Sequence, residues 1–221
     1  MMPGGPNPEL RELLFADLPP DRARTSFGAA GDSGHVVIAL ADAASGHDAV
    51  AAAAALAELA AMKPETRLLL QAWSLARAAG VPPDDDAKDV LGVVVDMGLD
   101  EGLDTLAGFA DGSARYLNHS GAAVIWDVPD MTVGQLVRGL LDAAGAIAVM
   151  TGVVEGARPE PPGPGGAMIS VLTLGGIHVG AGSASALSAD PWAGAVISAA
   201  VELMAELVRR ASTAGPGGAP A

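Results

Sequence analysis

Four successive runs of β-branched and apolar residues, separated by turn signals, limit the folds open to this chain. Asp111-Gly112 is a dipeptide that two-residue type I′ hairpin turns prefer, and Ser120-Gly121 is a second turn signal. Short connections of this kind join antiparallel strands. The pattern therefore predicts a four-stranded meander, with strands at Leu91 to Met97, Leu103 to Ala110, Ser113 to His119 and Ala122 to Asp127.

The sequence before the meander is mostly helical. An Ala-rich helix is predicted over 45–62, with Ser45 as its N-cap and Asp48 three residues later as in a capping box. A second helix is predicted over 64–80, and the two should form a helical hairpin. The β-branched run at 35–41 predicts a short strand, although it leads directly into helical sequence.

Helix and strand signals alternate after the meander. Asp130 or Thr132 can cap a helix that runs to about Met150. Asp190 directly before Pro191 is a strong start signal for a last helix, which should end near residue 210. Between these helices the sequence predicts a Pro/Gly-rich loop at 158–166 and then a hairpin with strands at 167–174 and 177–181.

These elements predict an α+β fold in which helices flank an antiparallel sheet of five to six strands, made from the meander and the late hairpin. In general topology the arrangement resembles profilin-like and roadblock-like folds, without any motif of either family. The expected domain organisation is a flexible N-terminal arm at 1–34, one α+β domain at 35–211 with the internal loop 158–166, and a disordered tail at 212–221.

Charge and composition exclude several classes of function. Lys and Arg total 12 against 26 Asp and Glu, so the net charge of −14 disfavours nucleic acid and anionic membrane surfaces. Cysteine is absent, which excludes disulfides and thiolate metal sites. The first residues lack the basic start and apolar run of a signal peptide, and the longest apolar stretches are short or interrupted by charge. We therefore expect a cytoplasmic protein without nucleic-acid or membrane partners.

Two motifs suggest chemistry but do not fit it. The segment 31–34, Gly-Asp-Ser-Gly, copies the residues around the nucleophile of chymotrypsin-like proteases, but no His precedes Ser33. The acidic residues between Asp84 and Asp104 suggest a divalent cation, but neither calcium-loop register offers a Gly at position six and an acid at position twelve. We therefore expect no metal and no cofactor, and interpret these acids as a solvated edge.

A glycine-rich hairpin and two histidines form the strongest candidate for ligand binding. Glycines allow the close backbone approach that a phosphate or carboxylate site requires. His119 and His178 could also meet as an acid/base or metal-binding pair, whereas strand alternation would turn Tyr116 away from Arg115 and His119. The candidate ligand-binding residues are His178, Gly176, Gly180, Gly182, Ser183, His119 and Arg115.

Two functions from different classes remain open. The first is a non-enzymatic protein-interaction or assembly subunit, a homodimer or part of a larger complex, because the last helix carries a broad apolar face. The candidate interface residues on that face are Val196, Ala200, Leu203 and Leu207. The alternative is a small-molecule-binding protein or hydrolase that uses the glycine-rich hairpin with His178 and His119.

Overall fold

A six-stranded antiparallel sheet organises the structure, a computed structural model that describes residues 8–28, 31–83 and 85–214. The strand order is β4-β3-β2-β1-β5-β6. The strands are β1 (Val90–Leu99), β2 (Gly102–Phe109), β3 (Ala114–Leu117), β4 (Ala123–Trp126), β5 (Gly166–Thr173) and β6 (Gly176–Ser183). The predicted α+β class is confirmed, and the late hairpin joins the meander because β1 pairs with both β2 and β5.

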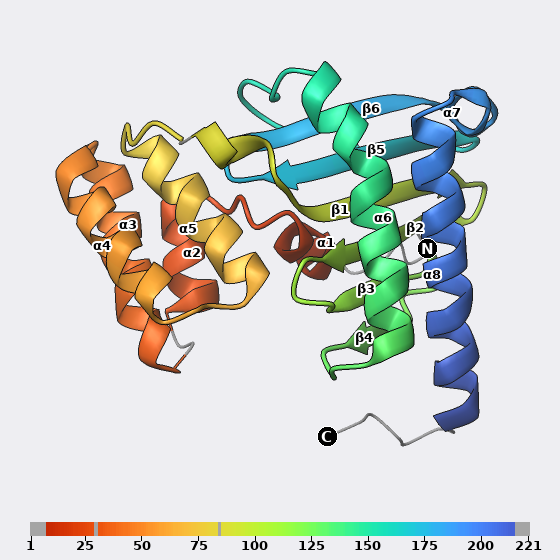
Figure 1. The fold of residues 1–221 in the computed structure, drawn as a ribbon, viewed down its shortest axis with the longest axis horizontal. Helices are drawn as coiled ribbons and strands as arrows, with labels where there is room; N and C mark the ends of the chain where they lie inside the picture. The colour runs from red at the N-terminus through yellow and green to blue at the C-terminus, as the bar shows by residue number, and fades with distance from the viewer. Residues whose placement is uncertain (1–7, 29–30, 84, 215–221) are drawn as a thin grey trace.

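Helices α6 and α8 cover one face of this sheet and lie in front of the strands in Figure 1. Helix α6 (Met131–Met150) begins at the predicted cap, where Asp130 Oδ1 accepts a hydrogen bond from the Val133 N–H at 2.9 Å. Helix α8 (Ala193–Ala214) begins after Asp190, whose carboxylate accepts from the next free N–H groups. Side chains of both helices interleave with those of the strands, among them Val93, Val95, Leu106, Ile169, Val137, Leu140, Val196 and Leu203.

Helix α6 is the one described helix that is long and apolar enough to cross a membrane by length and composition. Its apolar residues Val133, Val137 and Leu140 are buried against the sheet and α8. That burial is the pattern of a core helix in a folded domain, and it explains the mean hydropathy without a membrane.

The opposite face of the sheet is covered by the N-terminal segment. Helix α1 (Pro8–Leu14) and the turn after it place Leu14 and Phe15 against Phe109 and Leu172 of the strands. Arg11 of α1 forms two hydrogen bonds, at 3.1 and 2.6 Å, with the fully buried carboxylate of Asp96 in β1. The segment expected to be a flexible arm thus carries buried residues of the sheet core; its residues 1–7 and 29–30 lie outside the described part.

A group of helices stands beside the sheet: α2 (Pro20–Phe27), α3 (Gly34–Gly46), α4 (Ala49–Ala61) and α5 (Thr66–Ala78) (Figure 1). The strand predicted at 35–41 is therefore wrong, because this run is part of α3. Its buried residues Val36, Val37 and Leu40 recur at helical spacing and pack on the Ala-rich α4. The helical hairpin of α4 and α5 is present, but the N-cap of α4 is Asp48 instead of Ser45.

The turn between β2 and β3 differs from the predicted type I′ turn. Such a turn requires a positive φ at both central residues, but only Gly112 has one, at 84°. Asp111 instead forms two hydrogen bonds with Thr66 at the start of α5. One carboxylate oxygen of Asp111 accepts the Thr66 N–H, and the Thr66 hydroxyl accepts the Asp111 N–H. The turn is therefore shaped by the helix that docks against it.

The Pro/Gly-rich loop packs against the sheet, although its composition predicts a segment without packed structure. The Gly165 N–H donates to the Gly98 carbonyl at 2.9 Å, so the loop crosses the end of β1. The Arg158 guanidinium lies 3.8 Å from the centre of the Phe15 ring and pairs with Asp17 and Glu12 at 2.6 Å each. A short helix, α7 (Ala184–Ala189), was not expected, and α8 continues to Ala214, past the predicted start of the tail.

Candidate functional site

The ligand-binding residues predicted from the sequence lie in separate parts of the sheet. His178 lies in β6, and His119 follows β3. Strands β2, β1 and β5 stand between β3 and β6, which separates the two strands by roughly 19 Å at about 4.8 Å per step. The structure therefore does not bring His119 and His178 together, and they cannot bind one metal ion or exchange a proton directly.

His178 is a buried side chain that connects β6 to the end of α6. Its Nδ1 lies 3.0 Å from the Thr151 carbonyl oxygen. Because the Thr151 hydroxyl donates to the carbonyl of Ile147 at 2.7 Å, the hydrogen on Nδ1 is directed to the Thr151 carbonyl. Burial lowers the pKa of His178 and outweighs the opposing effect of this hydrogen bond. The neutral imidazole has a structural role in this position.

The Arg115 side chain binds groups at the end of β4. Its guanidinium donates to the carbonyls of Ala114 at 2.9 Å and Trp126 at 3.1 Å, and it forms an ion pair with Asp127. Burial lowers the pKa of Arg115, although Asp127 opposes this shift. Its hydrogen bonds hold β4, the last strand of the meander. Arg115 lies in β3, which three strands separate from the β6 strand of His178.

The candidate residues of the glycine-rich hairpin have structural roles. Gly176 has a φ of 142° at the turn, where a Cβ would touch Val153. Gly180 and Gly182 lie in β6, and a Cβ at Gly180 would meet no atom within 4 Å. Ser183 caps α7, since its hydroxyl accepts the Ala186 N–H at 3.2 Å. These residues form a turn, a strand and a helix cap.

The residues predicted to form an interface on the last helix are buried and do not form a free surface. Val196, Leu203 and Leu207 are 0% exposed, and Ala200 is 5% exposed. They belong to the core between α8 and the sheet. The apolar periodicity identified the buried face of α8 correctly, but the chain itself covers that face.

A pocket of about 200 Å³ remains between α8 and the sheet. Val201 is among its lining residues and is 51% exposed, so the pocket opens to solvent beside this side chain. Asp104 and Tyr116 supply the polar end of the pocket. The other lining residues are apolar: Val95, Met97, Leu99, Leu106, Ile197, Ala200, Val201 and Met204.

Asp104 is the centre of a polar cluster at that end. Its Oδ2 accepts the Tyr116 hydroxyl at 2.7 Å. Its Oδ1 accepts the backbone N–H of His119 at 2.8 Å and lies 2.9 Å from the ring Nδ1 of the same residue. Burial, followed by the hydrogen bond to Asp104 and its negative charge, raises the pKa of Tyr116. The phenol therefore stays protonated and keeps its hydrogen on Asp104.

The predicted alternation of side chains fails at this cluster. Tyr116 and His119 were expected on opposite faces, but both contact Asp104. Strand β3 ends at Leu117, and the following turn is held by Asn118, whose Oδ1 accepts the N–H groups of Ser120 and Ala122. Period-two alternation does not continue through a turn. The sequence predicts Asp104 as part of a solvated acidic edge, and only its contacts with Tyr116 and His119 in the folded chain reveal its role.

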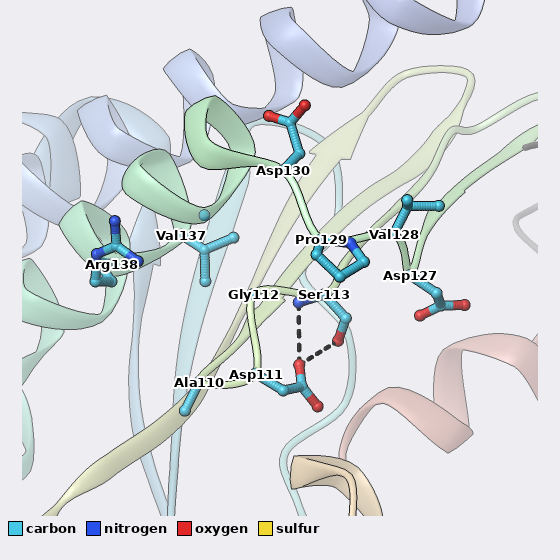
Figure 2. Close-up of a pocket in the computed structure, with 11 residues that line it drawn as sticks. Ala110, Asp111, Gly112, Ser113, Asp127, Val128, Pro129, Asp130, Val137 and Arg138 are labelled. Atoms are coloured by element: carbon cyan, nitrogen blue, oxygen red, sulfur yellow. Dashed lines mark hydrogen bonds between the residues drawn. The ribbon is translucent and has the colours of Figure 1, made fainter.

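A second pocket, of about 210 Å³, lies between the β2–β3 turn, the end of β4 and the start of α6. Its lining includes the carboxyl groups of Asp111, Asp127 and Asp130, which point in different directions in Figure 2. Each is already engaged: Asp111 with Ser113 and Thr66, Asp127 with Arg115, and Asp130 with the start of α6 and Arg210. These carboxylates stabilise the turn and the helix ends, and they do not converge on a ligand.

No known protein is similar enough to this chain for a functional site to be transferred from it. Within the described residues, no group of three or more His, Asp and Glu side chains could hold a metal ion. The Asp104–Tyr116–His119 cluster and its apolar pocket are therefore the best-defined candidate site, and they are characterised by geometry alone. No family model, no curated protein and no solved structure matches the chain.

Proposed function

We propose that this chain is a non-enzymatic, cytoplasmic protein-interaction subunit that forms a homodimer through the outer face of α4. The observation that carries the proposal is the composition of that face. Val50 is 83% exposed, and Glu58 is the one charged side chain between Ala49 and Ala61. The remaining exposed positions of α4 are alanines: Ala51, Ala53, Ala54, Ala57, Ala60 and Ala61. In a chain with a net charge of −14, such a helix face is unusual.

The spacing of these residues favours contact with another helix. Val50, Ala54, Ala57 and Ala61 follow one another at intervals of four, three and four, which is the spacing of a coiled-coil seam. Small side chains allow two helices to approach toward the lower end of the usual range of about 8–10 Å. A face of this kind therefore packs best against another narrow helix face.

Charge at the two ends of α4 favours a second copy in the antiparallel orientation. Asp48 caps the N-terminus, and Lys63 follows the C-terminus; both side chains are exposed. A two-fold axis near the middle of α4 would place Lys63 of one copy beside Asp48 of the other, at both ends of the contact. The same axis would place Ala54 of one copy against Ala57 of the other. Helix dipoles also oppose each other favourably in this arrangement.

The groups considered for catalysis support a non-enzymatic role. His178 and Arg115 are held by hydrogen bonds within the fold, and Ser183 caps a helix. His119 lies in the turn after β3, and three strands separate β3 from the β6 strand of His178, so the hydrolase alternative lacks a converging set of groups. An interaction function requires none of them.

Sedimentation velocity tests the proposed dimer over a range of protein concentrations. The wild-type chain should sediment at twice its 21.8 kDa mass, with a dissociation constant of about micromolar because one helix pair buries less area than a standard interface. Ala57→Glu should give monomer, since it places a charge in the seam while Glu keeps high helix propensity. Ala205→Glu, on the exposed side of α8, is the matched control and should leave the dimer intact.

A charge-reversal variant distinguishes the antiparallel contact from other arrangements. The double variant Ala54→Glu with Ala57→Lys would place opposite charges against each other twice across the axis. It should recover the dimer that Ala57→Glu loses. A wild-type chain that stays monomeric, or a dimer unaffected by Ala57→Glu, would contradict the proposal.

A further inference from the structure

We infer that the pocket between α8 and the sheet binds a small apolar molecule that carries a protonated amine. The inference is independent of the proposed dimer, because α4 and α8 lie at opposite sides of the molecule (Figure 1). It rests on three observations: the size and apolar lining of the cavity, its single polar end, and the acceptors that remain free there.

The size and lining of the cavity determine the apolar part of the ligand. A cavity of about 150 Å³ lined by Leu, Ile and Phe can hold benzene, and this pocket has about 200 Å³. Eight of its ten lining residues are apolar, and they come from β1, β2 and α8. A body of one aromatic ring, or an alkyl chain of similar volume, would fill it without leaving a buried polar group unpaired.

The polar end of the cavity determines the head group. A carboxylate has about four lone-pair positions, and Asp104 uses three: one for Tyr116 and two for His119. One position stays open on Oδ2, next to the Tyr116 oxygen, which donates its own hydrogen to Asp104 and remains an acceptor. The end of the cavity thus offers acceptors and negative charge, and it requires a donor.

Charge selects among possible donors. An ammonium group forms charge-assisted hydrogen bonds with a carboxylate, whereas an alcohol forms weaker neutral ones and a carboxylate ligand would be repelled. The overall charge of −14 acts in the same direction by attracting cations and repelling anions. His119 is a positioning residue in this site, since its backbone N–H and its ring Nδ1–H both hold Oδ1 of Asp104 and so restrict the orientation of this carboxylate, which lines the cavity.

The test uses three probes with the same apolar body: 2-phenylethylamine, 2-phenylethanol and 3-phenylpropanoate. Each is titrated into the ¹⁵N-labelled full chain, and amide chemical shifts report both the position and the affinity of binding. The amine should bind most tightly, the alcohol more weakly and the carboxylate least. The shifted amides should belong to the end of β1, the start of β2 and the middle of α8.

Two variants separate the roles of the cavity and the carboxylate. Val201→Trp should fill the mouth of the pocket and weaken the amine and the alcohol by at least about tenfold. Val208→Trp, a similarly exposed valine two turns along α8, is its matched control and should leave both affinities unchanged. Asp104→Asn should remove the preference for the amine over the alcohol while the alcohol still binds.

Three results would overturn the inference. The first is the absence of shifts from the amine at millimolar concentration in the wild-type chain. The second is equal weakening by Val201→Trp and Val208→Trp, and the third is an unchanged preference for the amine in Asp104→Asn. A melting curve of each variant, which should match that of the wild-type chain, shows that a loss of binding is not a loss of folding.

Discussion

At the scale of single residues, His178 illustrates how burial converts a titratable group into a structural one. Its folded-state pKa is lowered from 6.5 by burial, so the unfolded chain takes up a proton at this residue at a higher pH than the folded chain does. Stability from His178 is therefore complete above the unfolded value and decreases as the pH falls below it toward the folded value. The window of lost stability lies below pH 6.5, on the acid side.

We expect acid to destabilise the wild-type chain more than the variant His178→Asn. The Asn side chain retains a donor near the position of Nδ1 but does not titrate in this range. The measurement is the urea midpoint of both chains between about pH 7.5 and about pH 5, the range in which histidines change charge. His35, His47 and His119 are present in both chains, so the difference between the two curves isolates His178. Parallel curves for the two chains would contradict a structural neutral imidazole.

At the scale of elements, two glycines have different roles, one in close packing between elements and the other in the propensity of its helix. Gly98 lies in β1 where the Pro/Gly-rich loop crosses, and a Cβ there would overlap the carbonyl oxygen of Gly163. Gly139 lies on the exposed side of α6, and a Cβ there would meet no atom within 4 Å. The first glycine is required by a contact between elements, and the second only weakens its helix.

The two substitutions to alanine should therefore change stability in opposite directions. Gly139→Ala should stabilise the chain by up to about 1 kcal/mol, since Ala is the better helix former. Gly98→Ala should lower the free energy of unfolding and make the loop 158–165 more sensitive to protease, because the loop must move away from β1. Urea unfolding and limited proteolysis measure both effects. A neutral Gly98→Ala would show that the loop does not pack tightly.

At the scale of the whole molecule, the N-terminal segment and the Pro/Gly-rich loop close the second face of the sheet together. Phe15 is 1% exposed, and the guanidinium carbons of Arg11 and Arg158 lie 4.8 and 3.8 Å from the centre of its ring. Arg11 also satisfies the buried carboxylate of Asp96. Segments more than 140 residues apart in the chain thus form one layer of the core.

Phe15→Ala should consequently cost about 3–5 kcal/mol, as expected for a fully buried Phe. Leu10→Ala, in the helix α1 that precedes Phe15, is the control, since Leu10 is 38% exposed. It should change stability by less than about 0.5 kcal/mol if it acts as an ordinary surface substitution. The urea midpoint measures both. Equal small effects would mean that the N-terminal segment does not contribute to the core.

Elements whose signals lie within a few residues could be predicted. The β-branched runs of β1 to β4, the caps Asp130 and Asp190, and the hairpin of β5 and β6 all have local physical causes, since propensity and capping act over one turn or one strand. The apolar periodicity of α8 likewise identified its buried face. The periodicity does not indicate what covers that face. In the structure, the sheet of the same chain covers it.

Contacts between distant residues decided the rest. The run at 35–41 is a helix because α4 buries its apolar side, although its β-branched residues favour a strand. Asp111 caps a helix 45 residues earlier, so its turn departs from the predicted type. The sequence by itself determined the α+β class and the order of most elements. Only the tertiary structure separated His119 from His178 and assembled Asp104, Tyr116 and His119, because a site depends on which strands become neighbours, and no local preference carries that information.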